Sequence, residues 1–508
     1  MVVVSLTPEI ALDEIPVYAG GLGVLEGDKF YAAAEKNRPY VVLTPFYPKG
    51  YVEYVLSGED LIPHPQKTED FLRGLSPEPE MHVPSNRWGW FYVRPYAYVR
   101  SPAKVVFLHV VHPEPAAAAV ERLYVYESEE QRDIAAVVFA KAAAQYIRER
   151  IGVGEVRVLD LQESWGSLVV QLLAELVGRT RFIVHTIAPW TNLTLRADIV
   201  KSEIQVETAA DHLSLWNLSS EKSTKIITVS AKHEELVKKY SENYAWKTTH
   251  ITNGVYLGRW VHPEISSRVG LDASVDELAS ARERVREMLR SFLKQAKQGL
   301  RLDDNTMVVA WPRRITRYKR PYFVERLVND VGDDGVVVFA LAGKAHPKDG
   351  DGQHLMKRFL QLHREHGNVV YIPSYDLEKA KLILAGSDLL LFTPFPAWEA
   401  CGTSYMKAGV NGVPTLSSRD GGALEIIQDG VNGWLFGSEL SHVVNIYTDH
   451  EAVSRVDQSD YADLLRKFKE IRKVFAEKPR EYREVQLRAF ETMRRTCSVD
   501  RALEQYYG

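Results

Sequence analysis

Short runs of β-branched residues alternate with amphipathic helical segments along almost the whole chain. In the first half, the runs that predict buried strands are 39–48, 104–113, 156–162, 182–187 and 225–230. Parallel strands buried on both faces have this near-continuous apolar composition, and helices between them supply the crossovers. The pattern therefore predicts an α/β fold around a parallel sheet that helices cover on both faces.

The same alternation restarts near residue 300, after a long charged helical segment at 275–299. The strands expected in this second half are 306–312, 336–343, 369–373 and 388–394, each followed by a helical pattern. A restart of this kind predicts a second doubly wound sheet.

We therefore expect two Rossmann-like domains, 1–299 and 300–477, with a final helical segment, 478–508, that packs back on the first domain. Two doubly wound domains that face each other bind ligands in the cleft between them, outside the carboxyl ends of the strands. We therefore expect the glycine-rich, cationic and lysine-bearing segments described below to lie in this cleft.

The composition excludes several classes of protein. The 508 residues include 63 basic and 67 acidic side chains, a formal net charge of −4, so neither nucleic acid nor an anionic membrane is an expected partner. Only two cysteines occur, which excludes a disulfide framework, and no metal site is expected. The first residues lack the basic start of a signal peptide, and a cytoplasmic protein is expected. The many Glu, Lys and Arg residues favour a protein from a thermophilic organism.

Two segments have the composition of anion-binding sites. Segment 17–28, VYAGGLGVLEGD, includes Gly20, Gly21 and Gly23, which allow the backbone to approach a ligand closely; an ordinary structural turn is the alternative. Segment 313–320, RRITRYKR, follows a predicted strand and holds five cations. Cations at the start of a helix oppose its dipole, so this density favours a bound phosphate over plain surface charge.

A histidine and an Asn-Gly pair follow strands in the first half. His185 ends the predicted strand 182–187, and Asn253 and Gly254 lie in the loop HITNGVYLGRW. Each also has an ordinary interpretation: His185 as a structural histidine whose hydrogen bonds are satisfied within the fold, and Asn253 with Gly254 as a simple turn. The strand-end position of His185 strengthens the functional reading.

The segment 399-EACGTSYMK-407 places a lysine on an otherwise small and apolar helix. Lys407 falls one turn after Thr403 on the same helix face. A lysine buried among apolar residues has a lowered pKa, which suits an amine that forms a Schiff base with pyridoxal phosphate. The alternative is a buried ion pair with a carboxylate such as Glu425.

Together these segments resemble the α-glucan (glycogen, maltodextrin) phosphorylases, a family of retaining glycosyltransferases with the two-domain GT-B fold. The order of the motifs agrees from about residue 15 to residue 430: the glycine loop, HT at a strand end, TNG followed by Trp260, RRITRYKR, and EACGTSYMK. This chain resembles a reduced-length member of that family.

The resemblance implies a site and a reaction. The reaction is reversible phosphorolysis of an α-1,4-glucan or maltooligosaccharide by inorganic phosphate to glucose 1-phosphate, with pyridoxal phosphate as cofactor and a possible homodimer as the assembly. Lys407 would hold the cofactor, with Gly21, Thr403, Arg313, Lys319 and Tyr375 around it. His185, Arg314, Lys319 and Lys407 would be the catalytic set, and substrate would meet Gly20, Leu22, His185, Asn253, Arg314, Glu399, Cys401 and Gly402.

Four positions depart from the family pattern. The family has a lysine where Arg313 stands, a serine where Cys401 stands, another residue at Tyr405, and a histidine where Trp165 stands. These departures bear on the acceptor and leave the phosphate chemistry intact.

Two other classes of protein remain as alternatives. A nucleotide-sugar-dependent glucan synthase of the same GT-B fold would have a second glutamate at the position of Lys407, to accept hydrogen bonds from a ribose; a lysine cannot do so. A non-catalytic carbohydrate-binding relative is the second alternative, and the presence of Lys407, Arg314 and Lys319 disfavours it.

Overall fold

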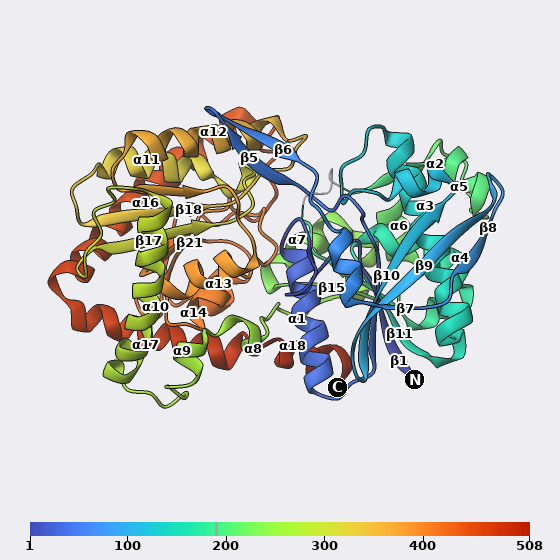
Figure 1. Ribbon diagram of the computed structural model, residues 1–508, viewed down its shortest axis with the longest axis horizontal. Helices are drawn as coiled ribbons and strands as arrows, with labels where there is room; N and C mark the ends of the chain where they lie inside the picture. The colour runs from blue at the N-terminus through green and yellow to red at the C-terminus, as the bar shows by residue number, and fades with distance from the viewer. Residues whose placement is uncertain (188–191) are drawn as a thin grey trace.

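The computed structural model describes residues 1–187 and 192–508, and it contains two parallel sheets, each embedded in helices (Figure 1). The sheets lie in different halves of the molecule, one built from the first half of the chain and one from the second. The mixed α/β class expected from the alternating pattern is confirmed.

The first sheet follows the order β16-β15-β12-β11-β1-β4-β10-β9-β7, and β8 pairs with β9. The pairs from β16 to β10 are parallel, and those made by β9 are antiparallel. Its strands are β1 (Val2–Leu6), β4 (Tyr40–Pro45), β7 (Ser76–Pro77), β8 (Met81–Ser85), β9 (Gly89–Arg100), β10 (Ala103–His112), β11 (Val156–Gln162), β12 (Thr180–Val184), β15 (Lys225–Thr228) and β16 (Thr248–His250).

The second sheet is parallel throughout, in the order β19-β18-β17-β20-β21-β22. Its strands are β17 (Met307–Pro312), β18 (Val337–Ala342), β19 (Val369–Ile372), β20 (Leu389–Phe392), β21 (Thr415–Ser418) and β22 (Trp434–Phe436). Every residue of β17, β18 and β20 is buried. Successive side chains of a strand point to opposite faces, so both faces of this sheet are covered.

Helices fill the crossovers between these strands. Those of the first half include α1 (Gly21–Glu35), α3 (Glu129–Tyr146), α4 (Ser167–Leu172), α5 (Ala197–Glu203), α6 (Leu215–Lys222) and α7 (Ala231–Tyr240). Those of the second half include α11 (Pro321–Val331), α12 (Gly350–Glu365), α13 (Leu377–Gly386), α14 (Ser404–Gly409) and α16 (His450–Glu477). Along the chain, the helix α10 (Val275–Ala296) follows the last strand of the first sheet and precedes the first strand of the second sheet. A capping box at Ser274 and Glu277 fixes its start.

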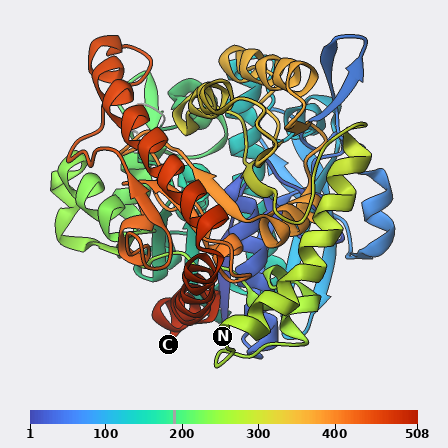
Figure 2. The ribbon, with the colours of Figure 1, turned by 90° about the vertical axis from the view of Figure 1, so that its left-hand side faces the viewer.

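The last two helices run back across the molecule. After α17 (Pro479–Thr496), the chain ends in α18 (Val499–Tyr507), which lies against α1 of the first half (Figures 1 and 2). The Tyr507 hydroxyl donates to Asp160, and the Arg181 side chain donates to the Tyr506 carbonyl at 2.6 Å. In the part of the chain described, no helix is long and apolar enough to cross a bilayer.

Candidate active site

A cavity of about 390 Å³ lies where the loops of the two halves meet. It falls within the size range of small-molecule sites. Each residue proposed from the motifs lines it: Gly20, Gly21, Leu22, His185, Asn253, Arg313, Arg314, Lys319, Tyr375, Glu399, Cys401, Gly402, Thr403 and Lys407. Most follow the carboxyl ends of parallel strands, which the doubly wound topology brings together at one edge of each sheet.

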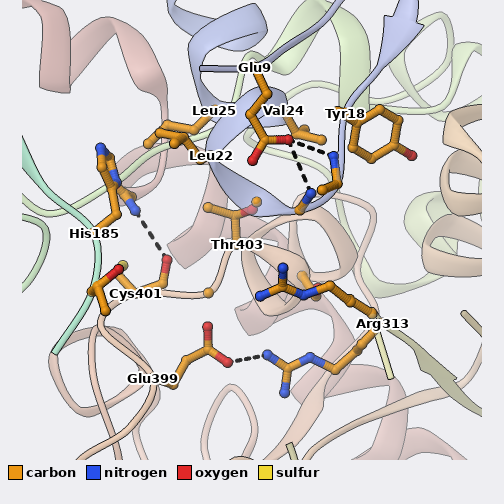
Figure 3. Close-up of a pocket in the computed structure, with 18 of the residues that line it drawn as sticks. Glu9, Tyr18, Leu22, Val24, Leu25, His185, Arg313, Glu399, Cys401 and Thr403 are labelled. Atoms are coloured by element: carbon orange, nitrogen blue, oxygen red, sulfur yellow. Dashed lines mark hydrogen bonds and ion pairs between the residues drawn. The ribbon is translucent and has the colours of Figure 1, made fainter. Parts of the chain in front are cut away.

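Segment 17–28, the glycine segment, lines the cavity where α1 begins. Gly20 is the N-cap residue, and Gly21 is the first residue of the helix. The Glu9 carboxylate fixes the backbone just before this helix, because its Oε2 accepts hydrogen bonds from the amides of Ala19 at 2.6 Å and Gly20 at 3.2 Å (Figure 3). Glycine is required at Gly23, where a Cβ atom would lie 2.9 Å from Glu9 Oε2.

Lys407 lies in α14, one turn after Thr403, and its amide donates to the Thr403 carbonyl at 3.0 Å. Its side chain is buried, and Nζ lies 4.2 Å from the centre of the Trp260 ring. Burial lowers the pKa of Lys407 to about 8, although nearby Asp28 opposes the shift. Among the described residues Nζ has no carboxylate within ion-pair distance, and Glu425 instead binds Thr252 and the Ala231 amide. The ion-pair alternative for Lys407 is therefore wrong.

The wall behind Lys407 is a buried polar cluster around Asp28 of α1. Asp28 accepts hydrogen bonds from Arg259 at 3.1 Å and from the Trp260 indole at 2.8 Å. Arg259 also pairs with Asp13 at 2.9 Å. These bonds fix the Trp260 ring, and with it the surface on which the Lys407 amine rests.

Three of the five cations in the segment 313–320 face the cavity, namely Arg313, Arg314 and Lys319. Arg313 forms an ion pair with Glu399 (Figure 3). Its guanidinium carbon also lies 3.8 Å from the centre of the Phe392 ring. The other two cations are structural. Arg317 pairs with Asp351 at the surface, and Arg320 is fully buried against Asp457 and Asp460.

Several cations in the cavity lack an ion-pair partner among the described residues. In the described chain, neither Arg314, Lys319 nor Lys407 has a carboxylate within ion-pair distance. Two nitrogens of Arg313 and one of Arg314 are buried without a hydrogen-bond partner there. Burial and the adjacent arginines lower the pKa of Lys319. Because buried cations without partners are costly, this arrangement favours an anionic ligand.

The remaining motif residues line the side opposite these cations. His185 Nε2 lies 3.0 Å from Gln162 Oε1, and the Gln162 amide in turn donates to Ser5. Nε2 therefore carries the proton and donates. Burial lowers the pKa of His185 to about 3, so the ring is neutral and suits hydrogen bonding to a ligand rather than proton donation. Asn253 Nδ2 donates to the Cys401 carbonyl at 3.1 Å, which ties the two halves together.

The sequence motifs did not predict that several other residues line the cavity, among them Glu9, Tyr124, Glu163, Trp260 and Tyr318. Trp260 was noted only as the end of its motif. Glu9 and Glu163 each follow a strand of the first sheet, β1 and β11, and this strand-end position is the signal that could have identified them.

The fold and the cavity define a class of protein, an α/β protein with a buried amine beside a cluster of cations in a cavity between two parallel sheets. The carbohydrate phosphorylase family model matches residues 361–506. The chain is 26% identical to glycogen phosphorylase of Aquifex aeolicus, over 91% of this chain and 80% of that one. It is 24% identical to maltodextrin phosphorylase of Thermococcus litoralis, over 84% of this chain but 61% of the relative. An uncharacterised protein of Methanocaldococcus jannaschii is 25% identical, over 81% and 83% of the two chains.

The chain is similar to carbohydrate phosphorylases over most of its length, and the family model itself matches only its C-terminal part, residues 361–506. It is shorter than these phosphorylases and spans about three fifths of the length of the maltodextrin phosphorylase.

Proposed function

We propose that this protein is an α-glucan phosphorylase, which transfers a glucosyl unit from the end of an α-1,4-glucan to inorganic phosphate with retention. The observation that carries the proposal is the cluster of Arg313, Arg314 and Lys319 beside the buried amine of Lys407. A phosphorolytic site needs two phosphate dianions in contact, and their mutual repulsion requires compensating cations.

The residues of the cavity fit pyridoxal phosphate. Lys407 has the depressed pKa that an amine needs to attach to an aldehyde carbon at neutral pH. The two partnerless nitrogens of Arg313 are donors that the phosphate group of the cofactor would satisfy. Thr403, Gly21, Lys319 and Tyr375 would complete the cofactor site. When bound, the cofactor supplies a phosphate group that exchanges a proton with the substrate phosphate.

The other side chains bind, orient and neutralise. Arg314 would hold the substrate phosphate through its guanidinium fork. Glu399, which Arg313 holds by an ion pair and whose ionised form Arg313 and Lys319 stabilise against burial, would accept a hydrogen bond from a glucosyl hydroxyl. His185, Asn253, Gly20, Leu22, Cys401 and Gly402 would complete the sugar site.

The same proposal extends to the arrangement of the chain. The two parallel sheets with the cavity between them support a GT-B division into domains 1–299 and 300–477. The contacts of α18 with α1 and Asp160 support the assignment of 478–508 as a segment that closes back on the first domain.

The test is an assay with maltooligosaccharides of graded length and phosphate, run in parallel with UDP-glucose and ADP-glucose as donors. We expect glucose 1-phosphate with α configuration from the first set and no transfer from the second. Transfer from a nucleotide sugar, with no glucose 1-phosphate from any glucan, would identify a synthase instead.

A further inference from the structure

The loop 397–403, which carries Glu399, has no regular structure of its own. It lies between β20, which ends at Phe392, and α14, which begins at Ser404. Its first residue, Ala397, has φ of 64°, a left-handed conformation that residues with a Cβ atom rarely adopt. Backbone of this kind persists only where the surrounding structure enforces it. The contacts that hold this loop therefore decide where Glu399 lies.

The Glu399 carboxylate is held through one of its two oxygens. Its Oε2 forms the ion pair with Arg313, and no described residue donates a hydrogen bond to Oε1 (Figure 3). Oε1 is thus the oxygen that remains for a sugar hydroxyl. A single ion pair does not fix the direction of a side chain with three rotatable bonds, so the direction of Oε1 also depends on the backbone at Glu399.

Asp420 holds this backbone from outside the cavity. Its Oδ2 accepts hydrogen bonds from the amides of Trp398 at 3.0 Å and Glu399 at 2.7 Å. Asp420 lies two residues after β21, it is 1% exposed, and it does not line the cavity. Hydrogen bonds from two successive amides to one carboxylate are charge-assisted, and they fix the peptide plane that leads into Glu399.

The loop that carries Asp420 also packs closely against the loop that carries Glu399. Gly421 has φ of 54°, and a Cβ atom there would lie 2.2 Å from the Glu399 carbonyl oxygen. A residue with a Cβ atom could not approach so closely. Two successive residues therefore contact the backbone at Glu399, Asp420 by hydrogen bonds and Gly421 by packing.

The first half of the chain holds the next two residues of the same loop. The Ser230 hydroxyl donates to the Ala400 carbonyl at 2.6 Å, and Asn253 Nδ2 donates to the Cys401 carbonyl at 3.1 Å. The loop is thus clamped from both sides, with its amides bound by Asp420 of the second half and its carbonyls by side chains of the first.

The Asp420 carboxylate is buried without a balancing cation. In the part of the chain described, it has no ion-pair partner, and its Oδ1 has no hydrogen-bond partner. Burial raises the pKa of Asp420 to about 7, although the amides that it binds oppose the shift. A carboxyl group in such surroundings costs stability. This cost favours a role in the site over a purely structural one.

We propose that Asp420 is a positioning residue for glucosyl transfer, which directs the Glu399 carboxylate towards the sugar by holding the amides of Trp398 and Glu399. The inference rests on the proposed function, in which Glu399 accepts a hydrogen bond from a glucosyl hydroxyl. Because Asp420 does not line the cavity, its effect passes through Glu399. Asp420 therefore affects sugar binding and leaves the phosphate contacts of Arg314 and Lys319 unchanged.

The test is calorimetric titration of the cofactor-loaded protein with α-D-glucose, together with steady-state kinetics for a maltooligosaccharide and for phosphate. Asp420→Ala removes the acceptor, whereas Asp420→Asn keeps an amide oxygen that can accept from both backbone amides. Asp429→Ala is the matched control, because Asp429 Oδ1 accepts from the Leu435 amide at 3.0 Å away from the cavity. A double variant, Asp420→Ala with Glu399→Ala, shows whether one residue acts through the other.

We expect Asp420→Ala to weaken glucose binding about tenfold and to lower kcat/KM for the glucan about tenfold to a hundredfold, because the sugar loses an oriented charged acceptor. Asp420→Asn should restore most of the loss, and KM for phosphate should change less than about threefold in every Asp420 variant. Once Glu399 is alanine, Asp420→Ala should change glucose binding less than about twofold. If Asp420→Ala does not fold, Asp420→Ser, whose hydroxyl can accept one of the two hydrogen bonds, should weaken glucose binding about threefold.

Glucose binding and glucan kinetics as in wild type, in an active enzyme that lacks the Asp420 carboxylate, would overturn the positioning role and leave the phosphorylase proposal intact. Equal losses with and without the Glu399 carboxylate would also overturn it, because the effect would then be a general structural one. The expected losses in a protein that transfers glucose from a nucleotide sugar would support the positioning role and overturn the proposed reaction. A wild-type protein with neither glucose binding nor phosphorolysis would overturn both.

Discussion

Burial gives Lys407 the property that its proposed role requires. With its pKa at about 8, about one amine in ten is neutral at pH 7, compared with about one in a few thousand for an exposed lysine. Only the neutral amine attacks an aldehyde. The helix environment around Lys407 predicted this burial from the sequence, but the Trp260 ring beneath Nζ and the Asp28 carboxylate come from other parts of the chain and could not be placed.

We therefore predict that cofactor-free protein reacts with pyridoxal phosphate at a rate that rises with pH and levels off above about pH 8. The lowered pKa means that the proton is lost near pH 8 rather than near 10.5. Stopped-flow absorbance gives the profile, with Lys407→Arg as the control without this phase. A midpoint near that of free lysine would contradict the burial argument.

Arg314 and Arg317 belong to one segment but face different surroundings. Arg314 lines the cavity without an ion-pair partner in the described chain, whereas Arg317 pairs with Asp351 at 3.4 Å on the surface. We predict that Arg314→Ala raises the apparent KM for phosphate about tenfold to a hundredfold while cofactor content is retained, because a charge-assisted contact to the anion is lost. Arg317→Ala should behave as wild type. Equal phosphate kinetics in the two variants would refute the division of roles.

At the scale of elements, each strand expected from the sequence is present, but β1, β21 and β22 were not expected, and the loops were predicted less well. The position of 313–320 after a strand predicts the start of a helix, but a 3-10 turn, Arg317–Lys319, comes first, and α11 begins only at Pro321. Arg320 is one of the five cations whose density predicts a bound phosphate, but it is buried against Asp457 and Asp460. Its partners lie more than a hundred residues further along, so no local pattern could reveal them.

The glycine segment depends on Glu9, which the sequence analysis did not identify. We predict that Glu9→Ala lowers the free energy of unfolding by about 2 to 4 kcal/mol, because the amides of Ala19 and Gly20 lose their acceptor. Glu9→Gln should cost about 1 kcal/mol or less, since its amide oxygen can still accept and its amide NH2 group can donate to the Tyr124 hydroxyl. Urea unfolding measures both. Equal losses in the two variants would show that the charge, and not the acceptor, holds the segment.

At the scale of the whole molecule, the returning C-terminal segment supports the loop that carries Asn253. The Val255 amide donates to the Cys497 carbonyl at 2.7 Å, and the Val499 amide donates to the Val255 carbonyl at 2.9 Å. Gly254 permits this approach, because a Cβ atom there would lie 2.6 Å from the Ser498 carbonyl oxygen. The sequence predicted a simple Asn-Gly turn, since the close contact is with a segment about 240 residues away.

We predict that Gly254→Ala destabilises the protein by about 1 to 3 kcal/mol, because backbone must move away from backbone. The same change should raise the KM for the glucan, since the Asn253 loop shifts with it. Gly270→Ala is the matched control, because a Cβ atom there meets nothing within 4 Å. Thermal unfolding and steady-state kinetics test both effects. Equal free energies of unfolding for the two variants would show that the C-terminal segment can move away from residue 254 without loss of stability.

The fold class and the membership of the cavity were predictable because both follow from local signals, the strand periodicity and short motifs at strand ends. The arrangement of Glu163 and Trp165 was not predictable, since the positive φ of Glu163 and the stacking of Trp165 on Tyr126 depend on contacts between separate loops. Only the folded chain brings these residues together.

The most direct measurement of the central proposal is borohydride reduction of the purified protein, followed by proteolysis and mass spectrometry. We predict one pyridoxyl group per chain, attached to Nζ of Lys407, and none in Lys407→Ala, which should also lose phosphorolysis. An unlabelled wild-type protein that still releases glucose 1-phosphate, or a label fixed on another lysine, would contradict the account.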